Sequence, residues 1–378
     1  RGPAGRQAGA GERGGTGSGI RRVRGTKSSM THLRMAVVGV GSLGQYHAQK
    51  LAACDGVELV AVVDPNERQG RHVAEQHGTQ WLDGPAELVN KLHGVIVATP
   101  TVFHLETARQ FLQSGVATFV EKPLAANVPD ATLLVETAER TGSILQVGHI
   151  ERFNPAFSLA QERCGYPLYV RCQRVSPYTF RSTDIGVTHD LMIHDIDLAL
   201  ALTGEMPTSV DAFGAVGIGP HEDMAVARLK MPGGAVIDLT ASRMSPQAER
   251  SLQIWGTNGC VHADLQSRLV RTWEPQGQFR NSPQLVHAIA ASTPDPRTLK
   301  DRVFGEWIQA DEIQAAADDA MSLELADFIA AIRNQTAPRV SGTEGLNAMI
   351  VAESVLEALD VWSYQTGRKQ GIQRKAAA

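Results

Sequence analysis

The sequence predicts an α/β protein in which a doubly wound parallel sheet is followed by an α+β domain with an open, mainly antiparallel sheet. Two patterns support this prediction. Apolar, β-rich runs alternate with helical stretches up to about residue 148, and beyond it several strand-like runs follow one another without helices between them. At 378 residues the chain is also long enough for two domains with buried cores.

The first 34 residues differ in composition from the rest. They contain nine glycines, eight Lys and Arg residues and a single acidic residue, Glu12. Such a segment buries too little apolar surface to offset its chain entropy, so we expect a disordered basic extension over 1–34. We expect that this segment is sequence read upstream of the true translation start, at Met30 or Met35, rather than a transit peptide. A nucleic-acid-binding arm is not favoured, because no aromatic residues are interleaved with the charges.

A glycine-rich turn follows the first predicted strand. The apolar run Met35–Val38 leads into Gly39-Val40-Gly41-Ser42-Leu43-Gly44, and a helical stretch begins near Gln45. A turn of this kind between a strand and a helix is the fingerprint of a Rossmann dinucleotide-binding domain. In that fold Gly39 permits the tight turn, Gly41 lets main chain approach a pyrophosphate, and Gly44 lets the helix pack closely on the strand.

The end of the second strand predicts which dinucleotide is bound. Val57–Val63 ends at Asp64, twenty residues after Gly44. A carboxylate there can accept hydrogen bonds from both ribose hydroxyls and repels a 2′-phosphate, which favours NAD. Arg68, one helical turn later, leaves NADP as the less favoured alternative.

Further strand–helix units complete this domain, which we place at 35–150. Strands are predicted at Gly94–Ala98, Ala117–Val120 and Ile144–Val147, with a helix at Val102–Ser114 between the first two. Ligands of doubly wound folds bind at the carboxyl ends of the strands. The polar residues that follow these strands therefore join the glycine turn as candidate cofactor contacts: Thr99, Pro100, His104, Glu121 and Lys122.

The second domain is predicted at 151–366, with a flexible tail at 367–378. Helices at Glu151–Arg163 and His189–Leu202 flank a strand at Leu168–Val175. The strand-like runs that follow are Ser209–Val216, Met224–Lys230, Ala235–Ser242, Ser251–Trp255, Cys260–Asp264 and Arg268–Trp273. Residues 274–320 have little periodicity and are expected to form a loop or a partial lid. Helices at Leu323–Arg333 and Thr343–Tyr364 close the chain.

Four motifs in this order resemble the Gfo/Idh/MocA family of sugar and cyclitol dehydrogenases, over about Met35 to Thr366. They are Gly39–Gly44, Ala98-Thr99-Pro100-Thr101 with His104, Glu121-Lys122-Pro123, and Asp190-x-x-x-His194-Asp195. The resemblance implies that Lys122 contacts nicotinamide and substrate, that His194 is the general acid/base and that Asp190 supports it. It also implies a homodimer or homotetramer formed through the C-terminal sheet.

Two further segments are similar to the branch of this family that contains UDP-N-acetylglucosamine 3-dehydrogenases: Gly148–Pro155 and Leu191–Asp197. This likeness implies NAD-dependent oxidation of a secondary hydroxyl on a sugar, at C3 of a UDP-N-acetylhexosamine. Oxidation of a free sugar or an inositol is the alternative within the family. A regulatory protein that senses NAD without catalysis is the alternative of another class, disfavoured because Lys122, Asp190 and His194 are all present.

The chemistry of alcohol oxidation fits these residues. Removal of the hydroxyl proton needs a base with a pKa near neutrality, which histidine provides. Asp190 and His194 are four residues apart, so on an α-helix they share a face and the carboxylate can orient the imidazole or hold the substrate. Lys122 can stabilise the alkoxide, or act as the base itself if its pKa is lowered.

Substrate contacts are predicted on either side of this helix. The candidates are Arg152, Asn154, Tyr178, Arg181 and His189. Arg152 and Arg181 are expected to pair with a diphosphate, because guanidinium groups bind phosphate oxygens bidentately. No metal site is expected, because His189 and His194 lie about 140° apart on an ideal helix. The lack of a long apolar run and of Cys-x-x-Cys pairs predicts a soluble, cytoplasmic protein with no membrane or nucleic-acid partner.

Overall fold

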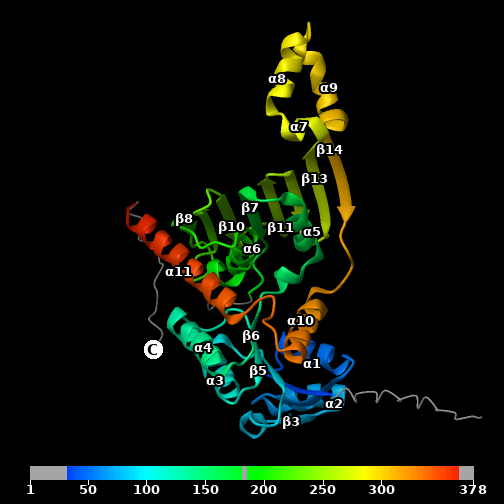
Figure 1. The fold of residues 1–378 in the computed structure, drawn as a ribbon. Helices are drawn as coiled ribbons and strands as arrows, with labels where there is room; N and C mark the ends of the chain where they lie inside the picture. The colour runs from blue at the N-terminus through cyan, green and yellow to red at the C-terminus, as the bar shows by residue number, and fades with distance from the viewer. Residues whose placement is uncertain (1–31, 181–184, 366–378) are drawn as a thin grey trace, which may run out of the picture. The chain divides into compact units, whose positions relative to one another are not determined.

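The computed structural model describes residues 32–180 and 185–365, which belong to one compact unit beginning at His32. The predicted fold class is confirmed: a parallel sheet with helices is followed by a mainly antiparallel sheet (Figure 1). The predicted extension lies outside the described residues except for its last few, and Leu33 and Arg34 belong to the first strand instead.

The N-terminal domain contains a six-stranded parallel sheet in the order β3-β2-β1-β4-β5-β6. The order reverses next to β1, and doubly wound sheets bind their ligands at such a point. The strands are β1 (Leu33–Val38), β2 (Val57–Val63), β3 (Gln80–Leu82), β4 (Gly94–Val97), β5 (Ala117–Glu121) and β6 (Leu145–Gly148). The helices are α1 (Gly44–Ala52), α2 (Glu67–His77), α3 (His104–Gln113) and α4 (Val128–Thr141).

Local sequence signals fix the ends of several helices. The side chain of Asn127 caps α4 by accepting a hydrogen bond from the main chain of Asp130, and Gly142 ends the helix in the left-handed conformation. The helix predicted from Glu151 begins four residues later as α5 (Pro155–Cys164), with Asn154 as its cap and a 3₁₀ turn before it. Proline is favoured at the first helical position, which explains the later start.

The C-terminal domain contains an eight-stranded sheet in the order β14-β13-β12-β11-β7-β10-β9-β8, antiparallel except for the parallel pair β7–β10. The strands are β7 (Pro167–Val175), β8 (Ser209–Ala215), β9 (Met224–Lys230), β10 (Val236–Ser242), β11 (Glu249–Gly256), β12 (Gly259–Asp264), β13 (Leu269–Pro275) and β14 (Ile308–Gln314). Between β7 and β8 lie a π turn (Thr188–Met192) and α6 (Ile193–Thr203).

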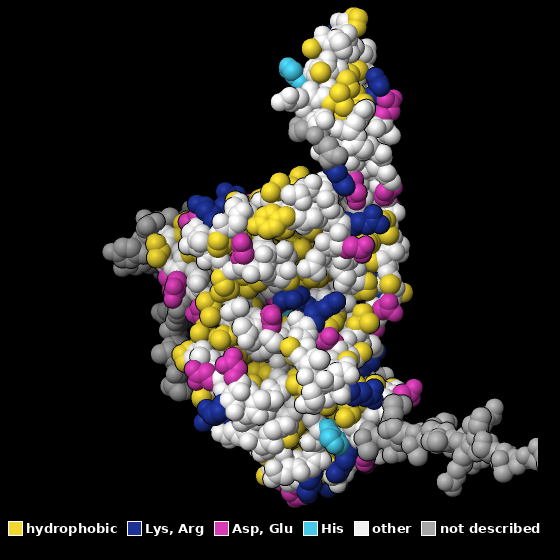
Figure 2. All heavy atoms as spheres, viewed as in Figure 1, with side chains coloured by type: hydrophobic (Ala, Val, Ile, Leu, Met, Phe, Trp, Pro, Cys, Tyr) yellow, Lys and Arg dark blue, Asp and Glu magenta, His cyan; other side chains and the backbone are white. Residues whose placement is uncertain are grey.

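Residues 274–320 are not the loop or lid that the sequence predicts. They form α7 (Gly277–Asn281), α8 (Pro283–Ser292), α9 (Lys300–Arg302) and the edge strand β14. In Figure 1 the three helices project past the ends of β13 and β14. Figure 2 shows hydrophobic side chains on this segment, and Val286 and Phe304 are exposed. Because much of β14 is exposed, its sequence lacks the apolar alternation that marks a half-buried strand.

Two C-terminal helices tie the domains together. α10 (Ala320–Asn334) returns to the N-terminal domain beside α1, where Leu325, Phe328 and Ile329 enter the core on one face of the parallel sheet (Figure 1). α11 (Gly342–Gln365) contacts α4, α6 and β8. Among the described residues, no helix combines the length and apolar character needed to cross a membrane.

Candidate functional site

The glycine turn between β1 and α1 has the geometry that a dinucleotide requires. Gly39 has φ +84°, and a Cβ there would lie 2.7 Å from the carbonyl oxygen of Ala98. A Cβ on Gly44 would lie 1.8 Å from the carbonyl oxygen of Gly39. By contrast, a Cβ on Gly41 would meet no atom of the described residues within 4 Å. The first and third glycines are therefore required by packing, whereas the second leaves open space beside the main chain, as pyrophosphate binding needs.

Asp64 lies at the carboxyl end of β2 and is joined to the glycine turn. Its Oδ2 accepts a hydrogen bond from the main-chain N–H of Val40 at 2.9 Å, and its Oδ1 accepts one from Asn66. Gln69 donates to the carbonyl oxygen of Val40 at 2.8 Å. The carboxylate is thus held beside the turn, where a ribose attached to the pyrophosphate would lie. Ser42 and Leu43 complete the turn and are exposed.

The segments after β4 and β5 are joined by a buried histidine. The two ring nitrogens of His104 each lie 2.9 Å from a carbonyl oxygen, one of Thr99 and one of Pro123. The Lys122–Pro123 peptide is cis. His104 is 1% exposed and both of its ring nitrogens are engaged, so it holds the two segments in place from within and leaves no ring nitrogen for a ligand.

Glu121, the last residue of β5, is also held from within. Its Oε1 lies 2.6 Å from Nε2 of His47 on α1. Burial alone would raise the pKa of Glu121, but the hydrogen bond and charge of His47, with Lys122 alongside, lower it below its usual value. Glu121 therefore fixes the end of β5 and contributes a negative charge beneath Lys122.

Lys122 and Asp190 meet between the two domains. The Nζ atom of Lys122 donates to the main-chain oxygen of Asp190 at 2.9 Å and lies 3.5 Å from its Oδ1. Asp190 lies in the π turn that precedes α6, and such turns are common at functional sites. Burial lowers the pKa of Lys122, although the charges of Asp190 and Glu121 oppose the shift. An amine with a lowered pKa releases its proton more readily than an ordinary lysine does.

His194 lies near Lys122 in a largely buried setting. Burial, reinforced by the positive charges of Lys122 and Arg174, lowers the pKa of His194 well below its usual value, so the ring is neutral. Its Nδ1 atom is buried and has no hydrogen-bond partner among the described residues. A neutral imidazole can accept a proton, as a general base must.

Asp190 is not hydrogen-bonded to His194, so of the two roles predicted for its carboxylate, orienting the imidazole or holding the substrate, the first has no hydrogen bond to support it. In the described residues its carboxylate contacts Lys122 instead, because the π turn changes the register of side chains around the axis. The carboxylate nearest to His194 in the chain, Asp195, pairs with Arg174 of β7, whose Nη2 lies 2.8 Å from Oδ1. Arg174 also donates to Glu151 at 2.8 Å.

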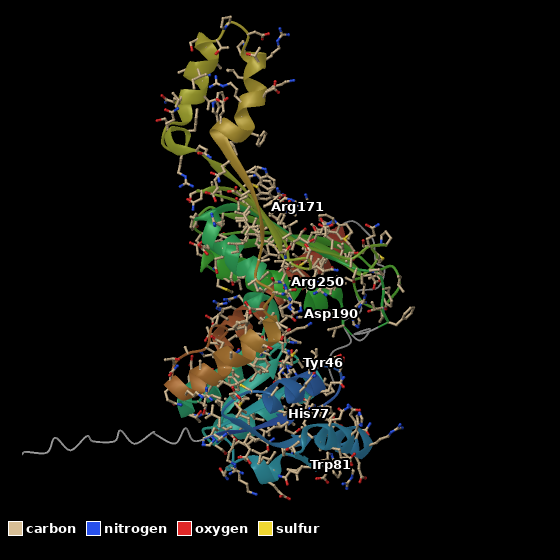
Figure 3. The ribbon with its side chains drawn as sticks, turned by 90° about the vertical axis from the view of Figure 1, so that its right-hand side faces the viewer. Tyr46, His77, Trp81, Arg171, Asp190 and Arg250 are labelled. Atoms are coloured by element: carbon tan, nitrogen blue, oxygen red, sulfur yellow. The ribbon has the colours of Figure 1, made fainter. Side chains whose placement is uncertain are left out.

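Figure 3 labels Asp190 and Arg250 on the C-terminal domain and Tyr46 of α1 on the N-terminal domain beneath them. Arg250 of β11 lies directly opposite Arg174 in the sheet and 3.7 Å from Glu151.

The predicted substrate contacts are mostly engaged within the protein. Arg152 donates to Asp197 at 2.9 Å; Asp197 is buried and Arg152 is partly buried. Asn154 caps α5, and its amide group also donates to Glu151 and to the carbonyl oxygen of Leu265, a set of bonds that accounts for this residue without a ligand. His189 lies 3.4 Å from Glu353.

The remaining two candidates lie in the segment that precedes the π turn. Tyr178 packs its ring 5.0 Å from the guanidinium of Arg243, which holds Asp223 at 2.6 Å. Arg181 lies outside the described residues.

Sequence reasoning did not single out His149 as a site residue, although it follows β6 as Lys122 follows β5. Its ring meets that of His194 edge to face, with 6.3 Å between the centroids. The signal in the sequence that could have identified His149 is its position directly after the end of a strand. Arg174 gave no such signal, because a polar residue within a half-buried strand is ordinary.

Comparison with known proteins places both domains. The family model "Oxidoreductase family, NAD-binding Rossmann fold" matches residues 33–149, and the "GFO/IDH/MocA C-terminal domain" matches residues 159–262. The chain is similar to the UDP-N-acetylglucosamine 3-dehydrogenase of Acidithiobacillus ferrooxidans, with 31% identity over 334 residues, which covers 88% of this chain and 99% of that protein.

Two further comparisons agree with this match. The scyllo-inositol 2-dehydrogenase (NAD(+)) of Bacillus subtilis is 33% identical over 249 residues, which covers 61% of this chain and 73% of that protein. A solved structure of the A. ferrooxidans enzyme superposes with a TM-score of 0.76 at 30% identity, covering 88% of this chain and 99% of that one. The predictions of an oxidoreductase and of a Rossmann domain that binds NAD are therefore confirmed. The chain belongs to the Gfo/Idh/MocA family of oxidoreductases.

Proposed function

We propose that this protein oxidises a secondary hydroxyl of a sugar with NAD, and that its substrate is a UDP-N-acetylhexosamine oxidised at C3. The observation that carries the proposal is the meeting of Lys122, Asp190 and His194 between the domains, with a lowered pKa for Lys122 and a neutral ring at His194. The substrate is proposed from the similarity to the A. ferrooxidans enzyme, which extends over nearly its whole length.

The residues divide the chemistry between them. When bound, NAD supplies the hydride acceptor at C4 of its nicotinamide. His194 is neutral and accepts the hydroxyl proton on its imidazole. Lys122, tethered to the main chain of Asp190, donates a hydrogen bond to the oxygen as it gains negative charge. Asp190 keeps the ammonium form of Lys122 available, because its charge opposes the effect of burial.

The cofactor would be held at the carboxyl edge of the parallel sheet. The open space beside Gly41 accepts the pyrophosphate, and Asp64 accepts hydrogen bonds from the ribose hydroxyls. We infer NAD rather than NADP because the Asp64 carboxylate would repel a 2′-phosphate.

One observation favours the alternative of a free sugar or an inositol. The guanidinium of Arg152, which the sequence offers as a phosphate partner, is already paired with Asp197 in a buried position. The similarity to the B. subtilis inositol dehydrogenase also covers most of that protein. A test of function must therefore present both substrate classes.

The test is the appearance of NADH absorbance when the protein and NAD are mixed with UDP-N-acetylglucosamine, UDP-N-acetylgalactosamine, free hexoses and inositols. Turnover of the UDP-sugars above the others supports the proposal. Turnover of inositols or free sugars alone would refute the substrate and keep the reaction class, and no turnover in the panel would refute both.

Variants then test the residue roles. His194→Asn should lose at least about a hundredfold in kcat while binding NADH as the wild type does. Lys122→Met should lose a similar factor, and Asp190→Asn an intermediate one. His77→Asn is the matched control, because Figure 3 places His77 on the N-terminal domain away from Asp190. If His194→Asn keeps nearly the wild-type turnover, His194 is not the base and the role is assigned to Lys122.

A further inference from the structure

His149 reaches the site from the N-terminal domain. It follows β6 directly, and Gly148 before it is paired with Glu121, the residue before Lys122. Two neighbouring strand ends therefore deliver Lys122 and His149 side by side. From the C-terminal domain, His194 meets His149 with its ring plane at 89° to that of its neighbour. His149 thus borders the imidazole to which we assign the substrate proton.

The ring of His149 is buried without hydrogen bonds. It is 1% exposed, and neither of its nitrogens has a partner among the described residues. Two other histidines are equally buried: His104 has a carbonyl oxygen at each nitrogen, and His47 is bonded to Glu121 through Nε2, although its Nδ1 has no partner among the described residues. Of these three rings, only that of His149 has neither nitrogen bonded. Buried polar atoms are nearly always hydrogen-bonded, and leaving them unbonded costs stability. The exception at His149 therefore calls for a partner that the chain itself does not provide.

The charge state of His149 limits what that partner can be. Burial, with the positive charges of Arg152 and Lys122 nearby, lowers the pKa of His149 to about 3. The ring is thus neutral at physiological pH, with one nitrogen that donates and one that accepts. A neutral donor–acceptor pair suits hydroxyl groups, which also donate and accept, and it offers no charge to bind a phosphate.

We infer that His149 is a substrate contact, hydrogen-bonding through its ring nitrogens to oxygens of the polyol ring next to the hydroxyl that His194 deprotonates. This inference rests on the proposed function only in that the substrate is a ring bearing hydroxyl groups, whether a nucleotide sugar, a free sugar or an inositol. His149 would then recognise the ring of the substrate, and neither a phosphate nor the cofactor.

The test compares His149→Phe, which keeps a flat ring but loses both nitrogens, with His149→Asn, which keeps one donor group and one acceptor. For the best substrate of the wild type, His149→Phe should lose about tenfold or more in kcat/KM, and His149→Asn should recover part of that loss. The dissociation constant for NADH, measured by fluorescence, should be unchanged in both. The Tm of His149→Phe should equal or exceed that of the wild type, because an unbonded polar group has been removed from the interior.

Each alternative gives a different result. A structural role would lower Tm together with activity, and a cofactor contact would weaken NADH binding; either result overturns the inference, as does unchanged kcat/KM in His149→Phe. His149→Leu repeats the test if the phenylalanine ring disturbs folding. Absence of turnover by the wild type would refute the proposed function and this inference together. Full activity in His149→Phe would refute the inference alone.

Discussion

Replacing Arg174 with methionine tests the buried charges that hold the site together. The Nε and Nη2 atoms of Arg174 donate to Asp195 at 2.8–3.2 Å, and Nη1 donates to Glu151 at 2.8 Å. The three side chains are at most 8% exposed. The substitution therefore removes the cation that two interior carboxylates share and leaves Glu151 with the more distant Arg250, 3.7 Å away.

The expected loss of stability is large. Removing one partner of a buried ion pair costs about 3–5 kcal/mol, because the group that remains is charged and desolvated. For a protein of this size that cost corresponds to a fall in Tm on the order of 10 °C. Because Asp195 adjoins His194, turnover should also fall while NADH binding persists.

The loss should depend on pH. In the wild type, burial alone would raise the pKa of Glu151, but Arg174 lowers it, so this carboxylate stabilises the fold above its unfolded pKa of about 4.5 and ceases to do so as pH falls. In Arg174→Met the unpaired carboxylates should have raised pKa values and bind protons more tightly when folded. Lowering the pH from 8 to 5 should therefore stabilise the variant relative to the wild type.

Calorimetry at pH 5, 6.5 and 8 measures both effects. Arg171→Met is the matched control, because Arg171 lies on the same strand with an exposed side chain (Figure 3), and it should change stability by less than about 0.5 kcal/mol. A loss in Arg174→Met below about 1 kcal/mol, or one that is the same at all three pH values, would refute this reasoning.

Four further substitutions test the N-terminal domain and α10, which packs on it. Asp64→Ala should weaken NAD binding far more than NADP binding, measured by titration with each reduced cofactor; a wild type that already prefers NADP would contradict the assignment. Gly44→Ala should prevent stable folding by its clash with the preceding turn, whereas Gly41→Ala should keep the wild-type Tm and lose NADH affinity; equal melting of the two variants would count against these roles. Burial raises the pKa of Glu324 well above its usual value, so the folded state holds a proton that becomes costly to keep as pH rises above about 4.5; Glu324→Gln should therefore raise Tm more at pH 8 than at pH 5, and the reverse order would disprove this explanation.

Local patterns in the sequence were enough to predict the parallel sheet and its glycine turn. The requirement for glycine at positions 39 and 44 arises from atoms a few residues away or on the adjacent strand, and the strands themselves are continuous apolar runs. The same rule, polar residues at strand ends, identified Lys122. Applied to β6, it would have identified His149 as well.

Features set by distant contacts could not be predicted in this way. The π turn is stabilised in part by Lys122, whose Nζ bonds to Asp190 from 68 residues away, so the sequence spacing, which predicts an α-helix, does not reveal this pairing. The sequence predicts Arg152 as a ligand contact, and nothing in it indicates that Asp197, 45 residues later, pairs with this side chain.

The return of α10 to the N-terminal domain determines the order in which the chain can complete its fold. During synthesis, the face of the parallel sheet that includes Met35 and Phe119 leaves the ribosome long before Phe328, whose ring lies 5.9 Å from that of Phe119. That face stays uncovered while about two hundred further residues are synthesised, and an exposed apolar sheet is prone to aggregate. A fragment ending near residue 150 should therefore need a chaperone, and α10, which emerges only after the strands of the second sheet, completes the first domain.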